Sequence, residues 1–84
     1  WMWNFIMRVM SQVTRLMAEK QLRENRLITP SELARETGLS YPTVLSWVRS
    51  DLRRFDEVAI VAFCTYFGCA ISDLLVLETE EGSG

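Results

Sequence analysis

Apolar residues recur at three- and four-residue spacings along most of the chain, the period of a helix that packs on one side. In the first segment these positions are Ile6, Val9, Val13, Leu16 and Met17. This spacing predicts a helix from about residue 4 to the low twenties. The polar segment Gln21–Leu27 either extends that helix or forms a loop around Asn25. Val, Ile and Thr do not alternate at period two, so nothing indicates a sheet.

The start of the second predicted helix carries several agreeing signals. Thr29 can cap it, Glu32 can complete a capping box, and Pro30 occupies the first helical position, where no N–H is needed. Gly38 can adopt the left-handed conformation that ends a helix. We therefore expect a short helix that begins after Thr29 and ends at Gly38.

A third helix is predicted to follow almost at once. Ser40 can cap it through the N–H of Thr43, because Pro42 has no N–H to offer. One face is apolar and should pack on the core: Val44, Trp47 and Val48. The opposite face carries Pro42, Leu45, Ser46 and Arg49. A helix with two such faces leaves one side free for a partner.

The rest of the chain predicts two more helices and a tail. Asp56 can cap a fourth helix that ends at Gly68. Its expected inward residues are Ile60, Val61, Phe63, Cys64 and Phe67. A short fifth helix is expected over Ile71–Val76, followed by a frayed acidic and linker-like tail over Glu78–Gly84. Residues 1–77 would form one domain, a size at which a single core is just sufficient.

Two short helices joined by a turn at glycine are typical of a helix-turn-helix. The stretch TPSELARETGLSYPTVLSWVRS, residues 29–50, resembles the lambda-repressor-like, XRE-type (Cro/C-repressor) helix-turn-helix family. The segment AFCTYFGCAISDLL is similar to the family's fourth and fifth helices, so that the resemblance covers about residues 9–76. It implies an all-α, compact five-helix bundle. It also implies a transcriptional regulator, often a repressor, that binds operator DNA, usually as a dimer, and has no enzymatic activity.

The resemblance also assigns site residues by matching positions. The base-contacting residues would be Tyr41, Pro42, Thr43, Leu45, Ser46 and Arg49. Phosphate contacts would come from Ser31, Arg53 and Arg54. Pro30 stands where family members often have glutamine, which removes one anchoring contact. The recognition helix has no Asn, Gln or Lys, so Arg49 alone could read a base through two hydrogen bonds. We expect modest sequence discrimination.

The charge distribution changes the picture given by the net charge of −2. Residues 1–54 hold all nine Lys and Arg against five acids, a net +4, whereas residues 55–84 hold six acids and no base, a net −6. Such polarity favours a basic part that meets a polyanion and an acidic part that faces away. A solvated surface with a chance asymmetry is the alternative interpretation.

The sequence offers little support for a metal site, a catalytic nucleophile or a membrane span. The chain has two cysteines and no histidine, so neither a zinc site nor a Cys-His nucleophile can be assembled, and no cofactor is expected. Cys64 and Cys69 are expected to be small, reduced hydrophobic residues, with a disulfide as the lesser alternative. The longest uncharged run, Val58–Ser72, is shorter than the about 20 residues of a spanning helix. Residues 1–7 lack the features of a secretory signal, and a cytoplasmic location is expected.

Two alternatives remain open from the sequence. Trp1, Trp3 and Phe5 precede the region of resemblance and could either form a partner surface or pack over the bundle. A homodimer could form through these aromatic residues or through the C-terminal helices. The apolar recognition face also suits a second class of protein, a helix-turn-helix module that binds protein, as an antitoxin or an assembly subunit does.

Overall fold

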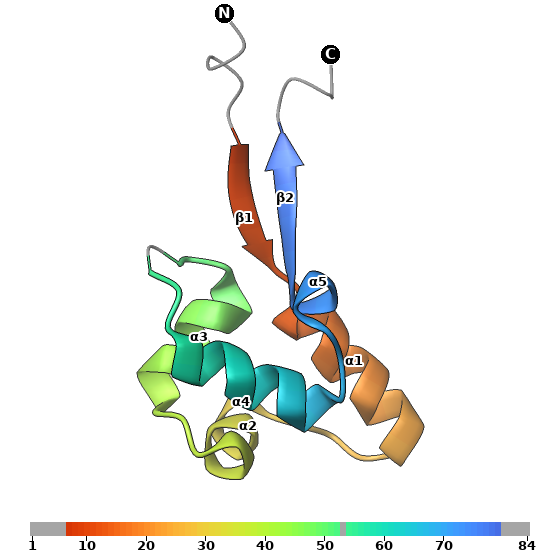
Figure 1. Cartoon of the computed structure of the whole chain (residues 1–84). Coiled ribbons are helices and arrows are strands. Elements are labelled where there is room, and N and C mark those ends of the chain that lie inside the picture. Colours follow the sequence, from red (N-terminus) through yellow and green to blue (C-terminus); the bar gives the residue numbers. More distant parts are fainter. Residues whose placement is uncertain (1–6, 53, 80–84) are drawn as a thin grey trace, which may run out of the picture.

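A computed structural model of the chain describes residues 7–52 and 54–79. Trp1, Trp3, Phe5 and Arg53 lie outside the described residues, as do residues 80–84. In chain order the elements are β1 (Met7–Ser11), α1 (Val13–Glu24), α2 (Pro30–Thr37), α3 (Tyr41–Arg49), α4 (Glu57–Phe67), α5 (Ile71–Leu74) and β2 (Leu75–Thr79). The five helices form the body, and the two strands form an arm that extends from it (Figure 1). The predicted five-helix fold is confirmed, with a small sheet added.

The sheet corrects the sequence analysis at both ends of the chain. β1 and β2 pair antiparallel, with Val9 opposite Leu77 and Ser11 opposite Leu75. Within the predicted first helix, Met7–Ser11 is therefore a strand and the helix begins only at Val13, whereas the fifth helix ends at Leu74 instead of Val76. Residues 78 and 79 belong to β2 and not to a frayed tail. Strand pairing prevails over the local helical spacing because each segment pairs along its whole length with the other, which lies near the opposite end of the chain.

The segment between α1 and α2 combines the two predicted possibilities. α1 continues to Glu24, and Asn25 then ends it in the left-handed conformation, with φ 54°. The capping box of α2 is confirmed: the N–H of Glu32 donates to Thr29 Oγ1 at 3.1 Å, and the N–H of Thr29 donates to Glu32 Oε1 at 3.3 Å. Gly38 ends α2 with φ 80°, a conformation that strains any residue with a Cβ.

The caps of the next two helices also follow the sequence. The N–H of Thr43 donates to Ser40 Oγ at 3.3 Å at the start of α3. The N–H of Val58 donates to Asp56 Oδ1 at 3.2 Å at the start of α4. Ser50 ends α3 in the left-handed conformation, with φ 57°, although it is not glycine. These local bonds fix where each helix begins and ends.

One apolar core joins all five helices. The buried residues are Val13, Leu16, Met17, Ile28, Leu33, Ala34, Val44, Trp47, Ala59, Phe63, Phe67 and Leu74. Trp47 of α3 is 2% exposed, and the centre of its ring lies 5.1 Å from the centre of the Phe63 ring of α4. Val61 was expected to point inward but is 55% exposed, and Ala59 fills the core instead. α4 is apolar nearly all round, so spacing alone did not define its buried side.

Candidate DNA-binding surface

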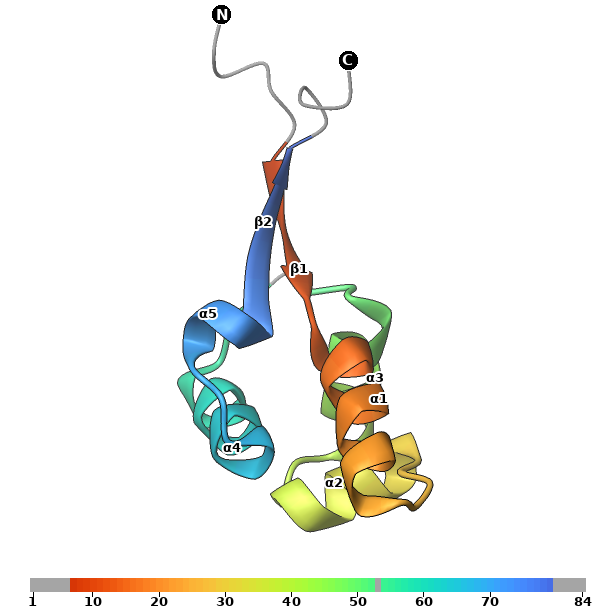
Figure 2. The same cartoon turned by 90° about the vertical axis from the view of Figure 1, so that its right-hand side faces the viewer.

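The helix-turn-helix consists of α2, the turn at residues 38–40, and α3 (Figures 1 and 2). The hydroxyl of Thr37 donates to the carbonyl of Leu33 at 2.7 Å and accepts the N–H of Leu39 at 3.3 Å. These bonds close the end of α2 and direct the chain into the turn. The motif is therefore held by short local contacts as well as by its buried apolar residues.

α3 is anchored at its C-terminal end by two elements that precede it in the chain. The hydroxyl of Thr14 in α1 donates to the carbonyl of Val48 at 3.0 Å. The N–H of Ser11 in β1 donates to Ser50 Oγ at 2.9 Å. Because the anchors lie on the inner side of α3, they leave its other side uncovered.

The outer side of α3 carries the residues predicted to contact bases. Tyr41 is 46% exposed, Pro42 and Arg49 are exposed, and Thr43, Leu45 and Ser46 are partly exposed. The inner side is closed by Val44 and Trp47, which are 0% and 2% exposed. The surface that α3 offers is thus only partly polar.

Two hydroxyls on this surface have local partners and retain hydrogen-bonding capacity. Ser46 Oγ donates to the carbonyl of Pro42 at 3.1 Å, so its lone pairs remain able to accept. Thr43 Oγ1 accepts from Ser40 Oγ at 2.8 Å, so its own hydrogen remains able to donate. Acceptors and donors of this kind suit the edges of bases in a major groove.

A shallow groove runs between α3 and the loop that follows it. It is lined by Thr43, Ser46, Trp47, Asp51, Leu52, Arg54 and Asp56. The groove places the predicted phosphate contact Arg54 beside the predicted base contacts Thr43 and Ser46. Arg53, the other predicted loop contact, lies outside the described residues. The sequence therefore identified residues that the fold brings together although they come from different elements.

Asp51 and Asp56 are the two acidic groove residues, and neither was predicted to belong to the site. The N–H of Asp51 donates to the carbonyl of Ser46 at 2.9 Å, which turns the chain back at the end of α3. Asp56 had been interpreted only as a helix cap. Their carboxylates weaken the attraction of this region for phosphates, and they are acceptors that a cytosine amino group can use. No pattern in the sequence indicated that the loop folds back beside α3.

Free positive charge is concentrated near this surface. Arg49 and Arg54 have no carboxylate within 4.0 Å among the described residues, and neither has Arg23 on α1. The remaining described Lys and Arg residues each have such a partner: Arg8, Arg15, Lys20, Arg26 and Arg35. Among the described residues, ion pairing thus leaves Arg49 on α3 and Arg54 in the groove beside it without a carboxylate partner.

The start of α2 offers a second place for an anion. Ser31 lies exposed in its first turn, where backbone N–H groups and the helix dipole favour negative charge. Arg35 is four residues further on the same face, and its side chain is 72% exposed. Glu32 lies between them and already serves the cap, so it reduces the local positive potential. Arg35 was not among the predicted site residues, although its i to i+4 spacing from Ser31 indicates that the two share one face of α2.

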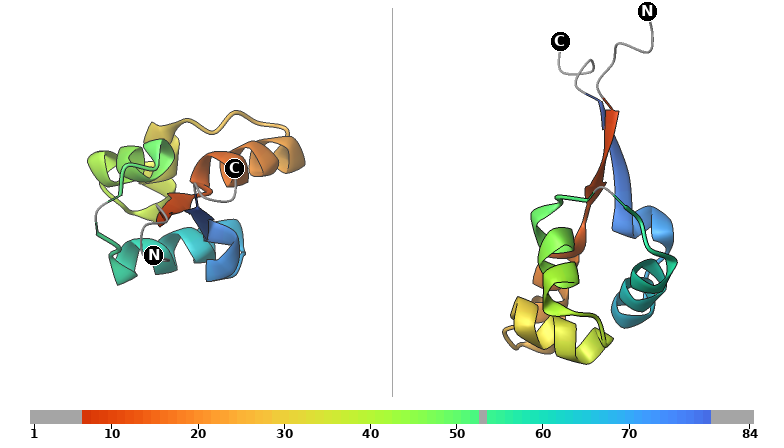
Figure 3. Two further views of the ribbon diagram at one scale, coloured as in Figure 1. Left: turned by 90° about the horizontal axis from the view of Figure 1, so that it is seen from above. Right: turned by 90° about the vertical axis from the view of Figure 1, so that its left-hand side faces the viewer.

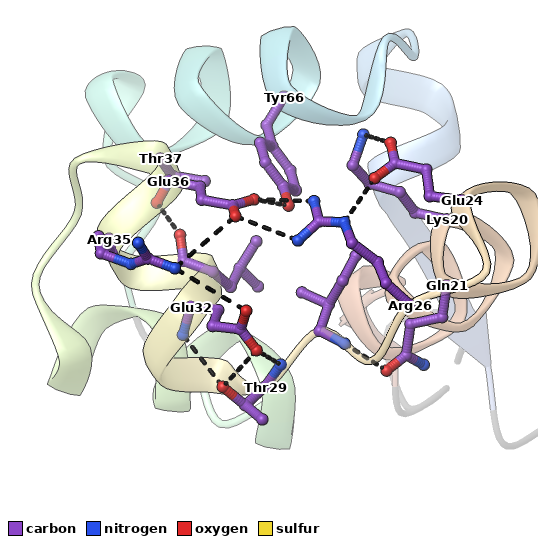
Figure 4. Close-up of polar contacts among 12 residues, drawn as sticks. Lys20, Gln21, Glu24, Arg26, Thr29, Glu32, Arg35, Glu36, Thr37 and Tyr66 are labelled. Carbon is purple, nitrogen blue, oxygen red and sulfur yellow. Dashed lines mark hydrogen bonds and ion pairs between the residues drawn. The ribbon is translucent and has the colours of Figure 1, made fainter.

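A polar cluster on another side of the body holds α2 and the preceding loop in place (Figure 4). Arg26 pairs with Glu24 at 2.7 Å and with Glu36 at 3.1 Å, and the hydroxyl of Tyr66 also donates to Glu36. Lys20 Nζ pairs with Glu24 at 2.6 Å and lies 4.7 Å from the centre of the Tyr66 ring. These contacts use Lys20 and Arg26 within the scaffold, which removes them as candidates for phosphate binding.

The charges of this cluster shift the pKa values of its members. Hydrogen bonds from Arg26 and then Tyr66 lower the pKa of Glu36 to about 2. Burial, followed by the hydrogen bond to Glu36, raises the pKa of Tyr66 to about 12. The hydrogen bonds of Lys20 and Arg26 lower the pKa of Glu24. Glu24 and Glu36 are therefore ionised around neutral pH, and Tyr66 acts as a neutral donor.

Comparison with known families agrees with this geometry. The family described as the Cro/C1-type HTH DNA-binding domain matches residues 12–80. The chain therefore belongs to this family, and the predicted resemblance is confirmed over residues 12–76. The family consists of DNA-binding domains and is typically non-enzymatic. No curated protein and no solved structure matches the chain significantly.

Features typical of metal-binding and membrane-spanning proteins are not found in the part of the chain that the structure describes. Among residues 7–52 and 54–79, no group of three His, Cys, Asp or Glu side chains is arranged to hold a metal ion. Within the same residues, no helix has the length and apolar character needed to cross a membrane. Cys64 and Cys69 are free thiols that pack partly buried against the core, and burial raises the pKa of Cys69.

Proposed function

We propose that the protein is a transcriptional regulator that binds duplex DNA through α3 and represses the genes next to its operator. The observation that supports this most directly is the outer side of α3, which includes Arg49 and has Arg54 beside it, on a domain of a DNA-binding family. Neither arginine has a carboxylate partner among the described residues. Repression would follow because a protein seated in the major groove blocks access to a promoter that overlaps its site.

The proposed docking inserts the N-terminal half of α3 into the major groove. Thr43 and Ser46 would hydrogen-bond to base edges, and Arg49 would reach a guanine or a phosphate at the groove edge. Tyr41 and Leu45 would contact thymine methyl groups. Pro42 lies at the first turn, where it rigidifies the helix start and adds an apolar contact.

Phosphates on both sides of the groove would fix the orientation of the domain. Ser31 and the first N–H groups of α2 would contact one strand, and Arg54, with Arg53 next to it in the sequence, would contact the other. Such contacts supply affinity without sequence information. With a single arginine on the reading side, sequence discrimination would be modest and would rely partly on DNA shape.

A second candidate function is a protein-interaction module, such as an antitoxin or an assembly subunit. Three observations favour it: the apolar Tyr41 and Leu45 on α3, the carboxylates of Asp51 and Asp56 beside it, and the internal pairing of most Lys and Arg residues. A protein partner would bury the same side of α3.

Titration of a fluorescent random-sequence duplex with the protein separates the two candidates. At low salt, a DNA-binding domain should show non-specific affinity of about 10⁻⁴ to 10⁻⁶ M or tighter, with affinity falling steeply as salt rises. A salt-insensitive signal, or no binding at about 10⁻⁴ M protein, would reject DNA binding and favour the protein-interaction module.

A further inference from the structure

Two cysteines flank the turn by which α4 leads into α5. The carbonyl of Cys64 accepts the N–H of Gly68, and it also accepts the N–H of Cys69 at 3.0 Å. Gly68 adopts the left-handed conformation, with φ 66°, that this kind of helix end uses. Such an ending brings the side chains of its first and last residues into contact, so the fold places Cys64 against Cys69.

The surroundings of the pair are apolar and half closed. Both thiols are partly buried against the core, and neither forms a disulfide. Burial raises the pKa of Cys69 most, the adjacent thiol of Cys64 raises it further, and Asp73 adds to this while Arg15 opposes it. Cys69 therefore stays a protonated thiol around neutral pH. Metal cations and peroxides react with the thiolate, so neither is the reagent that this pair suits best.

The number of soft ligands limits what the pair can bind. This chain has two cysteines and no histidine. A structural zinc ion takes four ligands, and inorganic arsenite can exchange three hydroxyl groups for thiols. A monosubstituted trivalent arsenical, R–As(OH)2, exchanges two, and its pyramidal arsenic atom then holds the two sulfurs close together. Two-coordinate copper(I) and mercury(II) instead hold their sulfurs on opposite sides of the metal, which does not match two contacting thiols.

We infer that Cys64 and Cys69 form a dithiol site for a monosubstituted trivalent arsenical. In this reaction two As–S bonds form while two S–H bonds and two As–O bonds break, and the hydroxyl groups leave with the thiol protons as two water molecules. Arsenic stays trivalent and sulfur is not oxidised, so no other reagent is needed. The product carries no net charge, which suits a half-buried, apolar position.

The turn leaves room for the organic group of the arsenical. A Cβ at Gly68 would meet no atom within 4 Å apart from those of its two chain neighbours, and Ala70 is exposed. The organic group can therefore point to solvent. The turn lies at the opposite end of α4 from the groove beside α3, which includes Asp56 (Figure 3). The dithiol site is thus separate from the proposed DNA-binding surface, and it is tested without DNA.

Intact-protein mass spectrometry with phenylarsine oxide tests the site directly. The reduced wild-type chain, mixed with one equivalent of this reagent and an excess of glutathione, should retain one phenylarsenic group per chain. Dimercaptopropanol, a small dithiol, should remove the group. Cys64→Ser and Cys69→Ser each leave a single As–S bond, so the affinity should fall by on the order of 10²–10⁴-fold and glutathione should strip the group.

Thr65→Ala is the matched control, since Thr65 is exposed on α4 next to Cys64 and carries no sulfur. It should retain the group as the wild type does. Cys64→Ala and Cys69→Ala repeat the test with a smaller residue, and circular dichroism should show that every variant keeps the helix content of the wild type.

Inorganic arsenite should leave no adduct in glutathione, because this chain has no third thiol to complete its ligands. A lasting arsenite adduct would contradict the assigned class of ligand. A wild-type chain that loses the phenylarsenic group to glutathione would overturn the site. So would single-cysteine variants that retain the group, or one arsenic atom shared between two chains.

Discussion

The hydroxyl of Tyr66 on α4 donates a hydrogen bond to the carboxylate of Glu36 on α2, which lies 30 residues earlier in the chain. The same carboxylate accepts two hydrogen bonds from Arg26, at 3.1 and 3.2 Å. The first helix of the helix-turn-helix is thereby joined to the fourth helix by polar contacts as well as by the core. The position of α2 relative to the body is consequently set by both.

The first prediction concerns this bond and the stability of the fold. Tyr66→Phe keeps the ring beside Lys20 and removes the donor, so the urea midpoint of unfolding should fall. Glu36→Gln should lower the midpoint as well. Because the two groups bond to each other, the double variant should lose less than the sum of the two single losses. Additive losses would show that the two side chains act independently.

The second prediction concerns acid stability. The pKa of Glu36 is lowered from its ordinary 4.5 to about 2 in the folded chain. The charged carboxylate therefore stabilises the fold fully above pH 4.5, and this contribution is lost as the pH falls through about 2. Urea unfolding between pH 5 and pH 2 should show a steeper loss for the wild type than for Glu36→Gln. Parallel curves would contradict the assignment.

The third prediction concerns the anchor of α3. Ser50→Ala removes the acceptor of the Ser11 N–H and leaves that group without a partner. It should lower the free energy of unfolding by about 1 kcal/mol, the usual net value of one such bond. Ser72, which is exposed on α5, offers a control, and its change to alanine should be nearly neutral. Equal effects of the two changes would argue against an anchoring role for Ser50.

The fourth prediction concerns phosphate contacts. Arg54→Ala should weaken binding to all duplex sequences alike and reduce the slope of log affinity against log salt by about 1. Arg23 on α1 provides the control, because it also lacks a carboxylate partner among the described residues but is not part of the groove beside α3. Arg23→Ala should leave the slope unchanged. If both variants reduced the slope equally, the contribution of Arg54 to binding would reflect the net charge of the protein and not the proposed docking.

The helices of the motif could be predicted because their signals are local. Caps at Thr29, Ser40 and Asp56 and left-handed glycines at 38 and 68 act over a few residues, and all appear in the structure. The outer side of α3 could likewise be read from the helical period. These features depend on neighbours within one or two turns, which the sequence displays directly.

The strands were missed because their pairing is not local. Val9 and Val13 are spaced as on a helix, yet Val9 pairs with Leu77 at the other end of the chain. One signal was present: the odd positions from residue 1 to residue 9 are all apolar, a period-two pattern carried by Trp, Phe and Met as well as Val. Alternation of Val, Ile and Thr alone does not reveal this pattern.

The electrostatics of the site also depends on the folded chain. The ion pairs that occupy Arg26 and the approach of Asp51 and Asp56 to α3 arise from loops whose path the sequence does not reveal. The positions of Arg49 and Arg54 could therefore be predicted from the sequence, but not that they lack carboxylate partners among the described residues. That distinction determines which residues can contact phosphate.

Selection from a random duplex library tests the central claim, that the outer side of α3 reads DNA. The wild-type chain should enrich a short motif of modest information content. Ser46→Ala and Leu45→Ala should each change the preferred base at one or two positions, whereas Arg23→Ala should return the wild-type motif. A library without any enriched motif, or a motif that the α3 variants leave unchanged, would contradict the account.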